Sequence, residues 1–490
     1  MFITNSHYPQ LSRGMRDLID TSPTIQYRVE LFATSLMDDP QKPSLVMADR
    51  RALLERYHSR WDGLQGDKWR RIVLPVHTKR VLEEGVLGCI AEARGGKLDV
   101  HFIQLPSISR EVRLKQWVVR GLPKCDTVMK ISPEADLLVV PEVVNERRYV
   151  VQTFGHLHGD DSWLSTFRIH ILRLSDGSPH PLAPIDSVMD YVDHESRNII
   201  SSLEILVSGH RLVAIAAFKG TFYFGRRNTL IVWDLRKGRR VLVSSYPPYQ
   251  NVTDVTATKK TSRYWVDQVQ FVDSHRIIAI TRPKEQSTTR SLVVWDTTTT
   301  RGRRLIFEMP TREADVLYTP KSLVDHSWVS SGAGLHRSDP NRRVVGILCR
   351  RTRGQVHDND DYMVTINAAD IRTHRPRKWR TTMRIPWQAW EGSTTVIQVV
   401  PSVTETTAIC GCKLFAMTKG LSGWNFIELL RIYDLSDGTR GGQNQNRPPI
   451  RDVVLNLGRG TVDEGKKMWC FSEDNLLLFH VSLYPSFVRG

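Results

Sequence analysis

The stretch Thr229-Leu-Ile-Val-Trp-Asp-Leu235 returns 62 residues later as Ser291-Leu-Val-Val-Trp-Asp-Thr297. Each copy is a run of β-branched and leucine residues that ends in Trp-Asp and leads into a short turn rich in glycine and arginine. Looser copies lie at residues 167–177 and 430–438. A strand, a turn and a return strand repeated about every 60 to 70 residues are typical of a β-propeller, whose blades are small antiparallel sheets.

Six runs of period-two or continuous apolar character are predicted as one strand of each blade. They span residues 100–105, 167–174, 229–235, 291–297, 362–367 and 429–435. Further apolar runs precede them, such as 136–140, 211–215 and 276–280, and are predicted as the neighbouring strands. The last two runs, 467–471 and 475–479, are expected to complete a blade that begins near residues 71–118, because such closure removes a free sheet edge. The prediction is a mainly β fold over residues 66–490, a propeller of six or seven blades.

Residues 1–65 instead show helical spacing and predict a short α-helical segment. In Leu11–Asp20 the apolar residues Met15, Leu18 and Ile19 have the spacing expected of one face of a helix. Ser22-Pro23 is typical of an N-cap followed by proline at the first helical position.

The helix that Ser22 opens is expected to end at Asp38-Asp39-Pro40. Its apolar stripe is predicted to contain Ile25, Val29, Phe32 and Leu36. A third helix is predicted from Val46 to Trp61, with an apolar face that contains Leu53, Leu54, Tyr57 and Trp61.

The composition is that of an ordinary globular protein with a strong excess of positive charge. Of the 490 residues, 40% are hydrophobic and 24% charged, and the net charge is +16. No run approaches the roughly 18 apolar residues that a membrane span needs, and the first residues do not form a secretory signal. We therefore expect an intracellular protein of the cytoplasm, the nucleus or both, without a membrane partner. The excess of lysine and arginine favours acidic partners.

The positive charge is concentrated after three predicted strands. If these segments are equivalent turns of successive blades, they emerge on one face and form a basic arc. Arginine suits carboxylates and phosphates because its planar fork donates two hydrogen bonds at once. The other interpretation, an ordinary solvated turn that keeps a basic protein soluble, applies to each cluster, and both interpretations stay open. The candidate partner-binding residues are Arg236, Lys237, Arg239, Arg240, Arg301, Arg303, Arg304, Arg372, Arg375, Arg377, Lys378 and Arg380.

No motif in the chain indicates catalysis, a cofactor or a metal. There is no Gly-x-Ser-x-Gly nucleophile, no dinucleotide-binding fingerprint and no helix with paired metal-binding histidines. The Trp-Asp pairs themselves are interpreted as structural, with each tryptophan packed between blades and each aspartate satisfying turn amides. We expect a binding protein with no catalytic, cofactor or metal site, and not an enzyme.

The stretches Pro23–Leu31 and Asp49–Trp61 resemble the helical segment of fungal F-box proteins. Residues 101–106, 126–140 and 171–182 resemble the β-rich region that follows in that family. The resemblance implies a substrate receptor of a cullin-type ubiquitin ligase, which an F-box attaches to a Skp-type adaptor. Most of the F-box is missing, since only residues 15–22 match its last helix. The adaptor-side residues that the resemblance implies are Met15, Leu18, Ile19 and Ile25.

Two functions follow from the sequence. The first is protein recognition, in which propeller loops present an acidic or phosphorylated target protein and a Skp-type adaptor binds the N-terminal helices. The alternative is a propeller scaffold outside ubiquitin chemistry that binds RNA or another polyanion through its basic loops. The first function requires binding to a Skp-type adaptor, whereas the alternative requires an affinity that falls steeply with salt, as expected of polyanion binding.

Overall fold

The computed structural model describes the helices, most of the strands and several turns. The described residues are 12–33, 36–38, 46–62, 79–83, 85–92, 96–106, 112–125, 129–149, 161–183, 188–193, 198–208, 210–220, 227–245, 264–273, 275–283, 291–298, 304–309, 314–318, 321–323, 336–338, 344–351, 361–373, 383–390, 394–398, 406–410, 413–422, 425–434, 451–455, 466–471 and 476–481. The predicted domain boundary near residue 65 lies outside them.

Three helices open the described chain, as predicted: α1 (Arg13–Thr21), α2 (Pro23–Ala33) and α3 (Met47–Asp62). Both predicted features of the α2 start are confirmed. The Ser22 hydroxyl accepts a hydrogen bond from the Ile25 amide at 3.4 Å, and Pro23 is the first helical residue. Ser12 caps α1 in the same way, since its hydroxyl accepts from the Met15 amide at 3.3 Å.

The predicted apolar stripe of α2 is wrong. Tyr27 and Leu31, one turn apart, are the buried residues, and they pack against Leu54 of α3, whereas Phe32 is 64% exposed. The apolar pattern did not identify Tyr27, because a tyrosine is usually buried only where its hydroxyl finds a hydrogen-bond partner, and that partner cannot be read from the pattern. That partner is the carboxylate of Asp38, to which the Tyr27 hydroxyl donates.

The α2 helix also ends earlier than predicted, at Ala33. Leu36–Asp38 forms strand β1, which pairs antiparallel with β20 (His336–Ser338), so Leu36 is not helical. Asp38 holds this segment against the helices, because it also accepts from Arg50 of α3 at 3.0 Å. In α3, Leu53 and Leu54 are buried as predicted, while the side chains of Tyr57 and Trp61 lie outside the described residues.

Within the described residues, six sheets of four or five strands succeed one another along the chain. The first is β2 (Lys79–Glu83), β3 (Val86–Glu92), β4 (Leu98–Gln104) and β5 (Lys115–Leu122). The second is β6 (Lys130–Ser132), β7 (Leu137–Tyr149), β8 (Asp161–Arg173) and β9 (Val188–Asp193). The third is β10 (Asn198–Ser208), β11 (Arg211–Gly220), β12 (Arg227–Asp234) and β13 (Arg239–Ser245).

The strands of the later sheets do not follow one another strictly along the chain. The fourth is β14 (Tyr264–Asp273), β15 (Arg276–Pro283), β16 (Ser291–Asp296), β17 (Arg304–Glu308) and β23 (Met383–Ile385). The fifth is β18 (Ala314–Tyr318), β21 (Val344–Arg351), β22 (Asp361–Asn367) and β24 (Thr394–Gln398). The sixth is β19 (Lys321–Leu323), β25 (Thr406–Cys410), β26 (Lys413–Ser422), β27 (Asn425–Asp434) and β28 (Arg451–Leu455).

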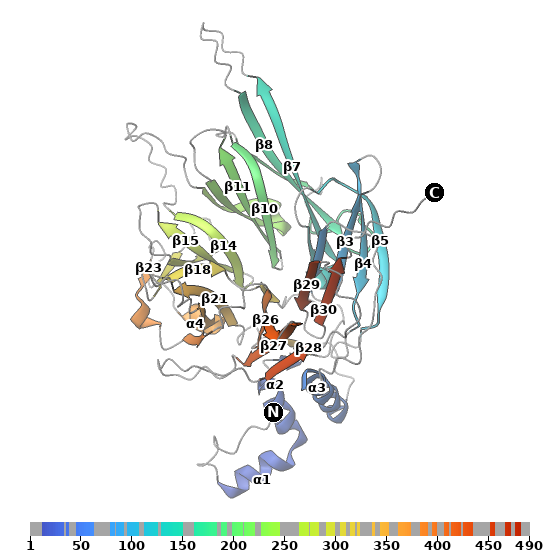
Figure 1. The fold of residues 1–490 in the computed structure, drawn as a ribbon, viewed down its shortest axis with the longest axis vertical. Coiled ribbons are helices and arrows are strands. Elements are labelled where there is room, and N and C mark those ends of the chain that lie inside the picture. Colours follow the sequence, from blue (N-terminus) through green and yellow to red (C-terminus); the bar gives the residue numbers. More distant parts are fainter. Residues whose placement is uncertain are drawn as a thin grey trace.

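The predicted mainly β fold is confirmed. Five of the six predicted strands are the third strands of their sheets, and the sixth, β27, is the fourth strand of the last sheet, after the added strand β19. Figure 1 shows the sheets following one another around the molecule in sequence order. The expected role of the C-terminal strands is wrong. Instead of completing the first sheet, β29 (Lys466–Phe471) and β30 (Leu476–Val481) form a two-stranded sheet of their own, and β29 lies near β25.

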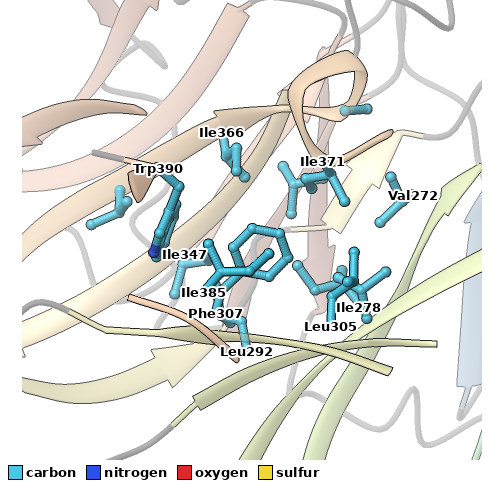
Figure 2. Packing of buried hydrophobic residues seen from close by; sticks show 14 of the residues in the cluster. Val272, Ile278, Leu292, Leu305, Phe307, Ile347, Ile366, Ile371, Ile385 and Trp390 are labelled. Carbon is cyan, nitrogen blue, oxygen red and sulfur yellow. The ribbon is translucent and has the colours of Figure 1, made fainter. Parts of the chain in front are cut away.

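The apolar core lies between neighbouring sheets. Trp233, 2% exposed, packs edge-on against Phe167 of the second sheet with ring centroids 6.0 Å apart. Trp295 is fully buried among residues of the third and fourth sheets. Figure 2 shows the next interface, where Phe307 of the fourth sheet meets Trp390 in a cluster shared with the fifth. The predicted packing role of both Trp-Asp tryptophans is confirmed.

Among the described helices, none has the length and apolar character that crossing a membrane requires.

Replacement of Trp295 by alanine should lower the free energy of unfolding by about 3–5 kcal/mol, because it empties the contact between the third and fourth sheets. Trp295→Phe should cost less, since it keeps a ring and removes an indole N–H that has no hydrogen-bond partner. Urea denaturation followed by fluorescence measures both, with Val118→Ala on exposed β5 as the control. A loss for Trp295→Ala no larger than that of the control would contradict the packing role.

Candidate functional site, a basic face at the sheet ends

The turn between β12 and β13 carries the first predicted basic cluster. Asp234 ends β12, and its Oδ1 accepts the amide of Arg236 at 3.1 Å, which starts the 3-10 turn Leu235–Lys237. Gly238 ends this turn in the left-handed conformation, at φ +56°. The side chains of Arg236, Lys237, Arg239 and Arg240 are all exposed around it. We call these four residues the basic hairpin.

A buried ion pair fixes the base of the basic hairpin. Arg211 starts β11 directly opposite Asp234, and its Nη1 lies 2.9 Å from Asp234 Oδ2, with the two side chains 8% and 4% exposed. The amide of Leu235 also donates to the carbonyl of His210 at 2.7 Å. The one acidic side chain of this hairpin is therefore committed to Arg211 and a backbone amide, and it points away from solvent.

The next sheet repeats the arrangement. Arg276 starts β15 opposite Asp296, and the amide of Thr297 donates to the carbonyl of His275 at 2.7 Å. Asp296 Oδ1 accepts the amide of Thr298 at 2.9 Å. The predicted role of both aspartates in turn amides is thus confirmed.

Sequence reasoning missed His210-Arg211 and His275-Arg276. The signal was present: Gly209-His-Arg-Leu and Ser274-His-Arg-Ile precede the two Trp-Asp runs at the same place in the repeat. The two histidines meet across the sheets, with ring centroids 6.1 Å apart and planes at 65°. Burial lowers the pKa of His210, and the nearby charges of Arg211 and Arg236 lower it further, against the opposing effect of Asp234.

The three predicted basic segments all connect the third and fourth strands of their sheets. Arg304 starts β17 opposite Trp295. Arg372 lies in the short helix α4 (Ala368–Thr373) between β22 and β24. The side chains of these two residues are not described, and Arg301, Arg303, Arg375, Arg377, Lys378 and Arg380 lie outside the described residues. The structure therefore describes the basic side chains of the first segment only, and both the basic arc and its binding role stay predictions.

The predicted adaptor-side residues lie on the first two helices. Helix α1 buries none of its side chains, and Met15 and Leu18 are 51% and 54% exposed. Ile19 and Ile25 are partly buried. Exposed apolar side chains gathered on one surface helix are typical of a contact with another protein.

In the part of the chain that the structure describes, no three His, Cys, Asp or Glu side chains are grouped in a way that could hold a metal ion. The side chains described at and beside the basic hairpin are those of Arg236, Lys237, Arg239 and Arg240, together with the imidazoles of His210 and His275.

No protein-family model and no curated protein matches the sequence. Several solved structures are similar in fold. The β-propeller domain of the trilobed protease from Pyrococcus furiosus is 9% identical, with 73% of this chain and 82% of that one covered and a TM-score of 0.33. Prolyl oligopeptidase B from Galerina marginata is 11% identical, with 80% of this chain and 44% of that one covered and a TM-score of 0.37. A post-proline cleaving enzyme from Rickettsia typhi is 10% identical, with 89% and 57% covered and a TM-score of 0.36.

These likenesses are distant and concern a propeller-like fold alone. They nevertheless correct the expectation that the chain is not an enzyme. That expectation treated a propeller as a docking surface, yet the fold neighbours are a protease domain and two peptidases that cleave peptides. A propeller-like arrangement of sheets therefore does not exclude an enzyme. The resemblance to F-box proteins gains no support from these comparisons.

Asp234→Asn should lower the free energy of unfolding by about 3 kcal/mol, because it keeps the oxygen that caps the turn but leaves the Arg211 charge buried without a counter-charge. Arg211→Met combined with Asp234→Asn should recover most of that loss. Chemical denaturation measures each variant. The matched control is Asp190→Asn, which breaks a cross-strand pair with Arg168 that is 3.6 Å long and about half exposed, and should cost less than about 0.5 kcal/mol. Equal losses at the two sites would contradict the anchoring role of the buried pair.

Proposed function

We propose that this chain is a protein-recognition module that binds an acidic segment of a target protein at its basic hairpin and a second protein at its N-terminal helices. The observation that carries the proposal is that the basic hairpin exposes its positive charges and buries its negative charge. Four cationic side chains are exposed, while the single carboxylate among them, Asp234, is buried against Arg211. The scaffold of the proposal is a propeller of six or seven blades, supported by the six larger sheets.

Charge and geometry make the hairpin suitable for an acidic partner. Each arginine can donate two parallel hydrogen bonds to a carboxylate or phosphate. The tight turn at Gly238 holds Arg236 and Lys237 on one side and Arg239 and Arg240 on the other. A net charge of +16 also attracts acidic partners over longer distances and speeds their encounter.

The second partner of the proposal is a Skp-type adaptor, with this chain as substrate receptor of a cullin-type ligase. The support is the resemblance of the helical segment to fungal F-box proteins, together with the exposed apolar residues Met15 and Leu18 of α1. The hydrogen bonds of Asp38 with Tyr27 and Arg50 tie this helical segment to β1 and so to β20.

The alternative is that the same basic hairpin binds RNA or another polyanion without an adaptor. The observation in its favour is also the cationic turn, since phosphate contacts need little more than lysine and arginine. Affinity for a polyanion falls steeply with salt and scales with the number of phosphates contacted, whereas binding of a short acidic peptide depends on salt less strongly.

Arg239→Glu combined with Arg240→Glu should weaken binding of a fluorescent glutamate-rich peptide at least about tenfold, because two attractive contacts become repulsive. Anisotropy at two salt concentrations measures the effect, with a single-stranded RNA of equal charge as the second probe. Arg113→Glu with Arg120→Glu makes the same charge change at two exposed residues, one just before β5 and one within it, and should have a much smaller effect. Equal effects of both double variants would show that binding depends on the overall charge of the protein and not on the basic hairpin.

Met15→Asp combined with Leu18→Asp should abolish co-purification with a purified Skp-type adaptor, because it places charge on the exposed apolar side of α1. The thermal unfolding midpoint should stay unchanged, since both side chains are already about half exposed. Val118→Asp changes an exposed apolar residue of β5 and should leave co-purification intact. Failure of the unmodified chain to bind the adaptor would remove the ligase-receptor part of the proposal and leave the acidic-target part to be tested at the hairpin.

A further inference from the structure

The histidine pair lies beside the basic hairpin, at the contact between the third and fourth sheets. His210 precedes β11, and His275 takes the same place before β15. The ring of His275 is exposed and that of His210 is partly buried, so the pair is open to solvent on one side. The backbone hydrogen bond from Leu235 to His210 places the turn that bears Arg236 at the same end of the sheet.

The carboxylates around the histidine pair are already engaged. The charged groups that act on the His210 ring are Arg211, Asp234 and Arg236. Next to His275 in the chain are Asp273 and Arg276, and Asp296 lies opposite Arg276 on the neighbouring strand.

Each of the three acids has a partner within its own sheet. Asp234 pairs with Arg211, and Asp273 Oδ1 accepts the amide of His275 at 2.8 Å while its Oδ2 lies 4.0 Å from Arg276. Asp296 accepts the amide of Thr298. The three acids thus bind within their own sheets, and the two imidazoles and Arg236 are the nitrogen-bearing side chains gathered at this end of the sheets.

We propose that His210, His275 and Arg236 form an anion-binding centre that accepts a carboxylate or phosphate side chain of the acidic target and binds it more tightly when the imidazoles are protonated. This inference rests on the proposed function and deepens it. The basic hairpin attracts the acidic segment at any pH between 5 and 8, whereas the histidine centre makes its retention depend on pH.

The direction of the pH dependence follows from proton linkage. In the unbound protein burial and the charges of Arg211 and Arg236 lower the pKa of His210, so its imidazole is neutral at pH 7.5. An anion beside an imidazole favours the charged form and raises its pKa, so binding takes up protons. Affinity must then rise as the pH falls from 7.5 to 5.5. A glutamate side chain, with an ordinary pKa near 4.3, stays charged throughout that window.

The experiment uses the full chain and a glutamate-rich peptide, with anisotropy at pH 7.5 and 5.5 and constant ionic strength. The unmodified protein should bind about three- to tenfold more tightly at pH 5.5, the range expected when one or two imidazoles gain charge. His275→Lys supplies a permanent charge, so it should bind more tightly than the unmodified protein at pH 7.5 and show a smaller pH dependence. His275→Ala should keep the affinity at pH 7.5 and lose much of the gain at pH 5.5.

His101→Ala is the matched control, because it removes a partly buried histidine from β4 in the first sheet and should keep the full pH dependence. Histidine NMR resonances add a direct readout, since the pKa of His210 should rise when peptide is added. A phosphoserine peptide at pH 7.5 separates the two ligand groups. A larger gain with His275→Lys for phosphoserine than for glutamate assigns phosphate to the centre, and the reverse assigns carboxylate.

The outcomes separate this inference from the proposed function. Binding that depends on Arg239 and Arg240 but does not change with pH, or keeps its full pH dependence in His275→Ala, overturns the histidine centre and leaves the basic hairpin as the target site. Unchanged histidine pKa values on binding do the same. Absence of binding to both peptides at either pH, with tight binding of RNA, overturns the centre and the proposed protein target together.

Discussion

The buried ion pair between Arg211 and Asp234 is the interaction on which the basic face depends. It joins the start of β11 to the end of β12 at 2.9 Å, with both side chains almost completely buried. An aspartate left in solvent at this turn would lie among Arg236, Lys237, Arg239 and Arg240 and offset part of their charge. Because Asp234 is directed inward to Arg211 and to the Arg236 amide, the hairpin gains a fixed turn and keeps its positive charge outside.

The Trp-Asp run links this turn chemistry to the packing of the sheets. Trp233 faces the second sheet, where it meets Phe167, while its neighbour Asp234 closes the hairpin. Alternation along a strand sends successive side chains to opposite faces, but at the strand end the chain turns and both residues are buried. The same division recurs with Trp295 and Asp296 in the fourth sheet. One short run therefore fixes both the contact between sheets and the turn that carries exposed charge.

Much of the fold could be predicted from the sequence, because strands and helix caps are determined largely by residues close to one another in the chain. The six predicted strands, the Ser22-Pro23 start of α2 and the structural roles of the Trp-Asp pairs all follow from period and turn chemistry. The predictions that failed depend on contacts between residues distant in the sequence. Tyr27 is buried because Asp38 reaches its hydroxyl, Leu36 leaves the helix to pair with Ser338, and β29 and β30 pair with each other. At the candidate site the arginines were visible in sequence, but the contact between His210 and His275 required knowing which sheets are neighbours.

The repeat also explains why the histidines meet. Each occupies the position before the second strand of its sheet, and its backbone carbonyl accepts from the residue after Asp234 or Asp296. In the third and fourth sheets these equivalent positions come close at the sheet ends, where the centroids of the two rings lie 6.1 Å apart. Two lysines at these positions would repel each other at every physiological pH. Two leucines would provide neither a positive charge nor a hydrogen-bond donor for an anion. Neutral imidazoles tolerate the contact and have one N–H donor each, whereas a protonated imidazole has two donors and a positive charge. Their place beside Arg236 puts that change in charge next to the face that the buried ion pair keeps cationic.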